Sequence, residues 1–337
     1  MSSNSFNLLV VSSKDGPELE VLKHLPLNVN IVGIGRSFNE LSHLTEDDWK
    51  SVTVLLSCGV GARAATRADI QEIWPKLVNL EWMHSASAGL EHLLFPELVN
   101  GPVTLTNAKG VYSHSLAEFA LSGCSWFAKD FPRLLRAKGL KNWDPFEVEE
   151  LRGRTMGIIG FGDIGRACAR LARAYRMKVI GLRRRTALSE SETREGLVDI
   201  MYGNNELSDL MASSDYVVVA LPYTPMTDKF VNRAAINSMR ANAVFVNVGR
   251  GKTVDEAALI DALVEKRIKG AALDVFATEP LPSDSPLWSL PNVFLSPHCA
   301  DKTREFQFET LEFFIENVLR FLDKRPLLNV CDKNVGY

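Results

Sequence analysis

The 337-residue sequence lacks an apolar run of the roughly 18 residues that a membrane-spanning helix needs. Its five cysteines are an odd number, widely scattered and without a CxxC pair, so we expect neither a disulfide framework nor a structural zinc site. Neither sign of charge dominates, because 38 Lys+Arg and 41 Asp+Glu leave a net charge of −3, which argues against a nucleic-acid-binding surface. The short polar N-terminus resembles neither a signal nor a transit peptide. We therefore expect a cytoplasmic protein with reduced thiols that binds neither membrane nor nucleic acid.

Apolar runs of strand length alternate with helical patterns along the chain, which is typical of a parallel sheet with helices on both faces. The first series of predicted strands is Phe6–Val11, Val29–Ile34, Val52–Leu56, Leu80–His84 and Val103–Thr106. The second series is Thr155–Ile159, Lys178–Leu182, Tyr216–Ala220, Ala243–Val248, Gly270–Val275 and Val293–Leu295. At about 150 residues per domain, these series predict an α/β protein of two doubly wound parallel-sheet domains, the first of them flavodoxin-like.

The segments around these strands carry three further predictions. A long apolar helix is predicted between the two series, with a capping box at Ser115 and Glu118 and a kink or break at Pro132. The amphipathic tail from residue 302 to 322 is expected to pack on the first series. The polar, acidic run 188–196 is predicted to be a surface loop.

A glycine motif, G-F-G-D-I-G at 160–165, joins a predicted strand to a predicted helix. In this context G-x-G-x-x-G indicates a dinucleotide-binding turn. Its first glycine allows the tight turn, the second lets backbone approach the pyrophosphate, and the third lets the helix pack on the strand. The helix N-terminus stabilises the phosphate charge. We therefore expect a cofactor-binding segment made of Gly160, Gly162, Asp163, Ile164 and Gly165.

The next strand ends in arginines where an acid is expected. In dinucleotide folds an acid at this place accepts hydrogen bonds from the adenosine ribose, but here Lys178–Leu182 is followed by Arg183, Arg184 and Arg185. An acid would repel a 2′-phosphate, whereas guanidinium groups bind phosphate. We predict NADP(H), held by Arg183 and Arg184, over NAD(H); the alternative is a solvated basic loop.

Arg250, Glu279 and His298 each follow a different predicted strand, which brings a cation, an acid and an imidazole to the sheet edge where ligands bind. The set fits the reduction of a 2-oxo acid. Arg250 would bind the substrate carboxylate and polarise the carbonyl, and His298 would protonate the carbonyl oxygen as hydride arrives. Glu279 would orient His298 and favour its charged form. Taken singly, each residue has a plainer interpretation as a structural histidine or a surface charge.

The sequence resembles the D-isomer-specific 2-hydroxyacid dehydrogenases over nearly its whole length. The resemblance rests on six blocks: Ser85–Glu91, Gly160–Gly165, Leu221–Thr227, Asn247–Gly251, Leu273–Pro280 and Ser296–Ala300. It implies a discontinuous substrate-binding domain, residues 1–114 and 300–337, with a Rossmann dinucleotide-binding domain, residues 115–299, inserted in it. It assigns Arg250, Glu279 and His298 as the catalytic arginine, acid and histidine, and it implies a homodimer.

The resemblance also implies roles for residues that line the site. Substrate carboxylate binding falls to Ser87, Ala88 and Gly89 together with Arg250, and cofactor lining to Pro222, Thr227, Val248, Asp274 and Ala300. Most members have Asp where this chain has Arg183, and the family's NADPH-preferring glyoxylate and hydroxypyruvate reductases depart similarly. A second departure is Asp301, where Gly is common.

The residues near the expected substrate favour a short 2-oxo acid. The loops Ser57–Ala62 and Ser85–Gly89 hold small and apolar residues, with Arg63 the nearby cation, whereas a phosphorylated substrate would need more positive charge. Glyoxylate or hydroxypyruvate is the first choice, and a larger apolar 2-oxo acid is the alternative. Trp143 and Phe146 either enter a pocket or pack as ordinary core aromatics.

A protein of another class would carry the same motifs, because dinucleotide-sensing corepressors on this fold can retain the three catalytic residues. Such scaffolds often use long disordered extensions, which this sequence lacks, so we predict an enzyme. Cys299 lies beside His298, but no third ligand at useful spacing accompanies them. We therefore expect no metal site.

Overall fold

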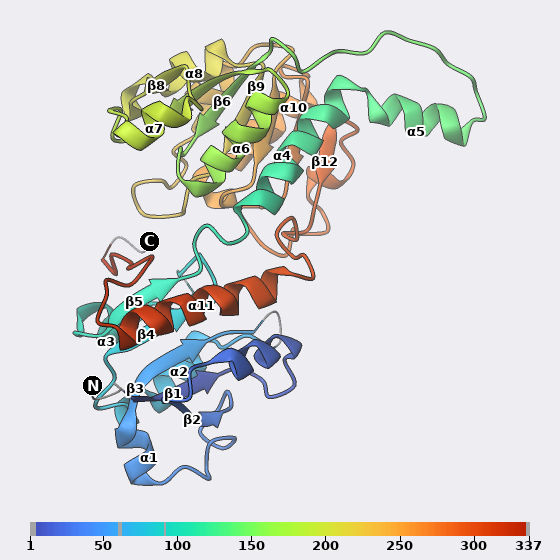
Figure 1. Ribbon diagram of the computed structural model, residues 1–337. Coiled ribbons are helices and arrows are strands. Elements are labelled where there is room, and N and C mark those ends of the chain that lie inside the picture. The colour runs from blue at the N-terminus through green and yellow to red at the C-terminus, as the bar shows by residue number, and fades with distance from the viewer. Residues whose placement is uncertain (1–4, 60–62, 91, 335–337) are drawn as a thin grey trace. The chain divides into compact units, whose positions relative to one another are not determined.

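The structure, a computed structural model, describes residues 5–59, 63–90 and 92–334. It divides into two compact units (Figure 1). Unit 1 is Met1–Val111 together with Thr303–Tyr337, and unit 2 is Tyr112–Lys302. Each unit is built around one parallel sheet, and unit 2 is inserted in the sequence of unit 1.

The sheet of unit 1 has five parallel strands in the order β2-β1-β3-β4-β5, so the predicted flavodoxin-like arrangement is confirmed. The strands are β1 (Phe6–Val11), β2 (Val29–Ile34), β3 (Val52–Ser57), β4 (Trp82–Ser85) and β5 (Thr104–Asn107). The helices are η1 (Pro17–His24), α1 (Glu46–Ser51), α2 (Arg67–Ile73), η3 (Trp74–Lys76), α3 (Pro96–Asn100) and α11 (Phe306–Leu322).

Helix α11 returns from the end of the chain to cover part of this sheet. Leu311, Phe314 and Val318, at helical spacing, are fully buried in a core shared with Leu8 and Trp82. The rings of Trp82 and Phe314 have centroids 5.3 Å apart. Burial of this apolar face ties the C-terminal segment to the N-terminal strands.

The sheet of unit 2 has seven parallel strands in the order β12-β11-β10-β9-β6-β7-β8, a Rossmann arrangement with one added strand. The strands are β6 (Thr155–Ile159), β7 (Lys178–Leu182), β8 (Ile200–Tyr202), β9 (Tyr216–Val219), β10 (Val244–Asn247), β11 (Gly270–Leu273) and β12 (Val293–Leu295). The helices are α4 (Ser113–Ala128), α5 (Phe131–Gly139), α6 (Asp163–Ala174), α7 (Glu190–Glu195), η4 (Asn204–Glu206), α8 (Leu207–Ser213), α9 (Arg233–Asn237), η5 (Gly251–Thr253), α10 (Glu256–Val264) and η6 (Pro286–Trp288). The strand order reverses between β6 and β9, which is where ligands bind in open sheets of this kind.

Helix α4 lies close to the sheet of unit 2 because its inner face is made of small residues. A Cβ added at Gly123 would lie 2.6 Å from the Cβ of Ala272 on β11, so a larger residue would push the helix outward. Ala117, Ala120 and Cys124 on the same helix are fully buried. Close packing thus fixes α4 against the strands that end at the candidate site.

The helix after Val111 differs from the prediction at its start and agrees with it at the break near Pro132. Helix α4 begins at Ser113, and the predicted capping box is wrong, because the Ser115 hydroxyl donates to the carbonyl oxygen of Ala300. The break predicted at Pro132 is confirmed. Asp130 has a left-handed φ of 47° between α4 and α5, and its side chain accepts from the N–H of Arg133.

The run 188–196, predicted as a loop, forms helix α7. Ser189 caps the helix, and the Glu192 side chain accepts from the Ser189 N–H in return. This reciprocal pair is a capping box, and the S-x-x-E spelling at 189–192 is the signal that indicates it. Strand β8 was also not predicted; it is three residues long and at the sheet edge, and Ile200 is half exposed.

Helix α5 and the segment after it extend away from the rest of unit 2 (Figure 1). Exposed apolar side chains on this arm, residues 131–148, include Leu134, Leu135, Leu140 and Trp143, the last 94% exposed. The core interpretation of Trp143 is therefore wrong. Over the described ranges, no helix combines the length and apolarity that crossing a bilayer demands.

Candidate active site

The glycine turn between β6 and α6 has the geometry that its motif predicts. Gly160 has a φ of 96°, in the left-handed region that favours glycine. A Cβ at Gly165 would lie 2.3 Å from the carbonyl oxygen of Gly160, whereas a Cβ at Gly162 would meet nothing within 4 Å. Gly160 and Gly165 are therefore required by the fold, whereas Gly162 leaves the backbone at the start of α6 open to a ligand.

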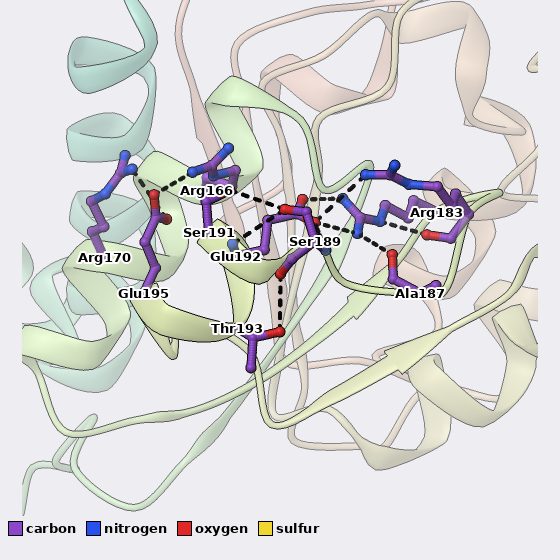
Figure 2. A network of polar contacts seen from close by, with 10 residues as sticks. Arg166, Arg170, Arg183, Ala187, Ser189, Ser191, Glu192, Thr193 and Glu195 are labelled. Atoms are coloured by element: carbon purple, nitrogen blue, oxygen red, sulfur yellow. Dashed lines mark hydrogen bonds and ion pairs between the residues drawn. The ribbon is translucent and has the colours of Figure 1, made fainter.

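At the end of β7, the Arg183 side chain is occupied by partners from its own chain (Figure 2). Its Nη1 and Nη2 contact the two carboxylate oxygens of Glu192 at 2.5 and 3.0 Å. The two side chains are only 16% and 10% exposed, and the hydrogen bonds from Arg183 hold the pKa of Glu192 far below its usual range. Arg184 and Arg185 are exposed. Glu192 is not among the site residues predicted from the sequence.

Glu279 and His298, which follow β11 and β12, form a direct pair. The distance from Glu279 Oε2 to His298 Nδ1 is 2.7 Å, and Glu279 Oε1 accepts from the Phe276 N–H at 2.9 Å. Backbone thus holds the carboxylate on one side while the carboxylate holds the ring on the other. With Nδ1 engaged, Nε2 is the ring nitrogen available for proton transfer. The histidine is 38% exposed, so a reacting molecule can reach it.

Arg250 follows β10, the strand beside β11. Its Nη1 donates to the carbonyl oxygen of Gly249 at 2.9 Å. A Cβ added to the next residue, Gly251, would lie 1.8 Å from the carbonyl carbon of Phe276, so the segments after β10 and β11 are in backbone contact. The structure therefore brings the loops of Arg250 and Glu279 together at one sheet edge.

Asp274 organises the loop that carries His298. Its Oδ1 accepts from the Ser296 hydroxyl at 2.7 Å and from the N–H groups of Cys299 and Ala300 at 2.9 and 3.1 Å. Its carbonyl oxygen accepts from the His298 N–H at 2.8 Å. Its Oδ2 is buried and has no hydrogen-bond partner within residues 5–59, 63–90 and 92–334. Asp274 thus holds the loop of His298 in place, and one of its carboxylate oxygens is left unpartnered among the described residues.

The other predicted cofactor-lining residues follow strands of the same sheet. Thr227, after β9, donates from Oγ1 to the carbonyl oxygen of Pro222 at 2.7 Å and accepts from the Thr224 N–H at 2.8 Å. Val248, after β10, is buried, and its N–H donates to Val219 at 3.0 Å. Because the carboxyl ends of parallel strands share one edge, these loops lie at the same edge of the sheet as the glycine turn.

The predicted carboxylate loop, Ser87 to Gly89, lies in unit 1 after β4. The Ser87 N–H donates to the Ser85 hydroxyl at 3.2 Å, and the carbonyl oxygen of Ala88 accepts from the Asn107 amide at 2.6 Å. The loop is therefore fixed by side chains at the ends of β4 and β5. Glu91 of the block Ser85–Glu91 and residues 60–62 of the predicted substrate loop Ser57–Ala62 lie outside the described residues.

Two further residues singled out in the sequence have distinct surroundings. Burial raises the pKa of the Asp301 carboxyl, and His298 opposes this rise. Phe146 lies under the guanidinium of Arg133, with 4.2 Å from its ring centroid to the guanidinium carbon. Phe146 thus braces the arm.

Residues 124–300 match the family described as D-isomer specific 2-hydroxyacid dehydrogenase, NAD binding domain. The chain belongs to the D-isomer specific 2-hydroxyacid dehydrogenase family. A glyoxylate reductase from Korarchaeum cryptofilum is 33% identical over 263 residues, which cover 75% of this chain and 76% of that protein. A D-3-phosphoglycerate dehydrogenase from Methanocaldococcus jannaschii is 32% identical over 273 residues, 80% of this chain and 51% of that protein.

Solved structures of the family share the fold of the whole chain. The D-isomer specific 2-hydroxyacid dehydrogenase from Xanthobacter autotrophicus Py2, in complex with NADPH and MES, has a TM-score of 0.81 at 28% identity, with 99% of this chain and 100% of that chain covered. The NADPH-dependent glyoxylate/hydroxypyruvate reductase from Sinorhizobium meliloti, in complex with NADP and sulfate, has a TM-score of 0.80 at 25% identity, with 99% and 100% covered.

Proposed function

We propose that this family member reduces a short 2-oxo acid to a D-2-hydroxy acid with NADPH, with glyoxylate or hydroxypyruvate as the first candidates. The observation that carries the proposal is the 2.7 Å contact between Glu279 and His298, on the sheet whose β6–α6 turn has the dinucleotide fingerprint. An imidazole held by a carboxylate beside a dinucleotide site is suited to donate a proton to a carbonyl. The glyoxylate reductases among the relatives support the substrate class.

In this proposal the three catalytic residues divide the work. Arg250 binds the substrate carboxylate through its fork of N–H groups. His298 gives the Nε2 proton to the carbonyl oxygen, and Glu279 stabilises the ring through Nδ1.

The cofactor assignment rests on how well the chain's own residues suit a dinucleotide. When bound, NADPH supplies the hydride for the reduction. The open backbone at Gly162 suits a pyrophosphate, and the unpartnered Oδ2 of Asp274 suits an amide donor. Exposed arginines after β7 favour the 2′-phosphorylated cofactor, and the family structures with NADPH and NADP support this choice.

We further propose a homodimer formed through the arm, in a reducing, cytoplasmic setting. Leu134, Leu135, Leu140 and Trp143 expose a run of apolar side chains that a second copy would cover. The five cysteines are unpaired, which suits a reducing compartment. Light scattering on the protein and on Leu135→Glu tests the dimer, since the variant is expected to shift toward monomer.

The experiment that tests the function measures the reduction of a panel of 2-oxo acids, monitored by absorbance at 340 nm. Glyoxylate, hydroxypyruvate, pyruvate, phenylpyruvate and 4-methyl-2-oxopentanoate are each offered with NADPH and with NADH. The proposal expects the highest kcat/KM for glyoxylate or hydroxypyruvate with NADPH. A preference for phenylpyruvate or 4-methyl-2-oxopentanoate would replace the short substrate by a larger apolar one. No turnover with any substrate would favour a dinucleotide-sensing scaffold.

A further inference from the structure

The Arg183 side chain, which the sequence assigns to the cofactor phosphate, has little capacity left to bind one. A guanidinium carries five N–H donors. Nε donates to the carbonyl oxygen of Arg185 at 2.6 Å, Nη1 to Glu192, and Nη2 to both Glu192 and the carbonyl oxygen of Ala187 at 3.1 Å. We call these contacts the Arg183 clasp. They use four of the five donors, whereas a bidentate grip on phosphate needs two free ones.

The clasp ties three neighbouring pieces of unit 2 together. Arg183 stands at the end of β7, the two carbonyl oxygens belong to the loop that follows, and Glu192 belongs to α7. Glu192 Oε2 also accepts from the Ser189 N–H at 2.8 Å, which completes the cap of α7. The turn from β7 to α7 is thereby folded around one side chain (Figure 2).

The two arginines on that turn differ from Arg183. In the part of the chain that the structure describes, Arg184 is exposed and makes no hydrogen bond or ion pair. The Arg185 side chain is 68% exposed and forms a longer ion pair with Glu192, at 3.6 Å. Both residues are therefore exposed on the turn that the clasp ties together.

We propose that Glu192 is a positioning residue for cofactor selectivity: it locks Arg183 into the clasp, and the clasp presents Arg184, with Arg185 beside it, as the cation that binds the 2′-phosphate. This inference rests on the proposed use of NADPH. It assigns to Arg183 the scaffold of the phosphate subsite and to Arg184 the contact with phosphate.

The proposal and simple electrostatics predict opposite signs for one substitution. Glu192→Gln removes a negative charge beside the subsite, so Coulomb attraction alone would tighten the binding of a phosphate. If the carboxylate acts as the clasp, the same change loosens the loop and weakens that binding, because the neutral amide loses the charge-assisted, two-point contact. The sign of the effect therefore separates a positioning role from a merely opposing charge.

The experiment measures calorimetric Kd values of the full-length protein for adenosine 2′,5′-bisphosphate and for adenosine 5′-monophosphate. Neither probe requires turnover. We expect Glu192→Gln to lower the preference for the bisphosphate about fivefold and Arg184→Gln to lower it about tenfold or more. Glu195→Gln is the matched control. It lies in the same helix but pairs with Arg166 and Arg170 at 2.5 and 3.4 Å, outside the clasp, so it is expected to leave the preference unchanged.

The outcomes separate the two proposals. A wild-type protein that binds both probes equally overturns the NADPH assignment and this inference with it. If the wild type prefers the bisphosphate and Glu192→Gln leaves that preference unchanged or increases it, the inference alone is overturned. If Glu192→Gln weakens both probes equally, or if Glu195→Gln lowers the preference as much, the role of Glu192 is general folding of the region. Thermal unfolding of each variant accompanies the titrations. The clasp is supported if the double variant Arg183→Glu with Glu192→Arg recovers the preference for the bisphosphate that the single variant Arg183→Glu loses.

Discussion

Two pairs of a carboxylate and a cation lie in unit 2 and differ in what their contacts allow. Glu279 and His298 share one contact of 2.7 Å and are 34% and 38% exposed. Glu192 and Arg183 share two contacts and are 10% and 16% exposed. An imidazolium can release its proton near neutral pH, whereas a guanidinium stays charged. Exposure, number of contacts and acidity of the cation therefore separate a pair suited to react from a pair suited to hold a loop.

The largest effect that tests this contrast is expected for His298→Asn. Asparagine cannot give a proton to the substrate, so kcat is expected to fall about 10³-fold, within the range of general acid catalysis. Binding of NADPH, followed by fluorescence titration, is expected to change little, since the described contacts of His298 are with Glu279 and Asp274. A variant that turns over at nearly the wild-type rate would place the proton donor elsewhere.

Glu279→Gln tests the other half of the same pair. Glutamine keeps an oxygen near Nδ1 but loses the charge that stabilises the imidazolium, so kcat is expected to fall about 10²-fold. Steady-state kinetics at saturating NADPH measures the loss. Glu195→Gln serves as the control, because it makes the same change in a surface ion pair. Equal kcat values for the two variants would contradict the role of Glu279.

The sequence predicted the Glu279–His298 pair better than the Arg183–Glu192 pair, for a physical reason. Apolar runs in the sequence predict buried parallel strands. The residues that follow such strands, such as Glu279 and His298, therefore lie at the same edge of the sheet. The partner of Arg183 depends instead on which way a long side chain turns. Glu192 lies in a polar run that was predicted as a loop and forms a helix. The side chain of Ser115 is a similar case, because it bonds to Ala300, distant in sequence, instead of capping its own helix.

A second histidine sharpens the contrast, since His84 is completely buried whereas His298 is partly exposed. Burial lowers the pKa of His84 from 6.5 to about 3. As pH falls below 6.5 the unfolded chain takes up a proton that the folded chain refuses. The stability contributed by neutral His84 is therefore present above pH 6.5 and is lost progressively between 6.5 and 3.

This linkage predicts that the free energy of unfolding falls by about 2 kcal/mol between pH 7.5 and 5.0 because of His84 alone. Urea unfolding of the wild type and of His84→Gln at both pH values measures it. The variant is expected to lose less stability than the wild type over this interval, because glutamine does not titrate. Parallel losses in the two proteins would show that His84 does not control this pH dependence.

The smallest effect, and the one most specific to the holding pair, is expected for reversing its charges. Arg183→Glu places a carboxylate against Glu192, so repulsion opens the clasp, and the ratio of kcat/KM with NADPH to that with NADH is expected to fall about tenfold. Adding Glu192→Arg restores an ion pair of opposite polarity and should recover much of that ratio, although position 183 then carries a negative charge. Were Arg183 itself the phosphate ligand, the double variant would be no better than the single one. Recovery in the double variant would place Arg183 in the scaffold and leave Arg184 as the phosphate contact.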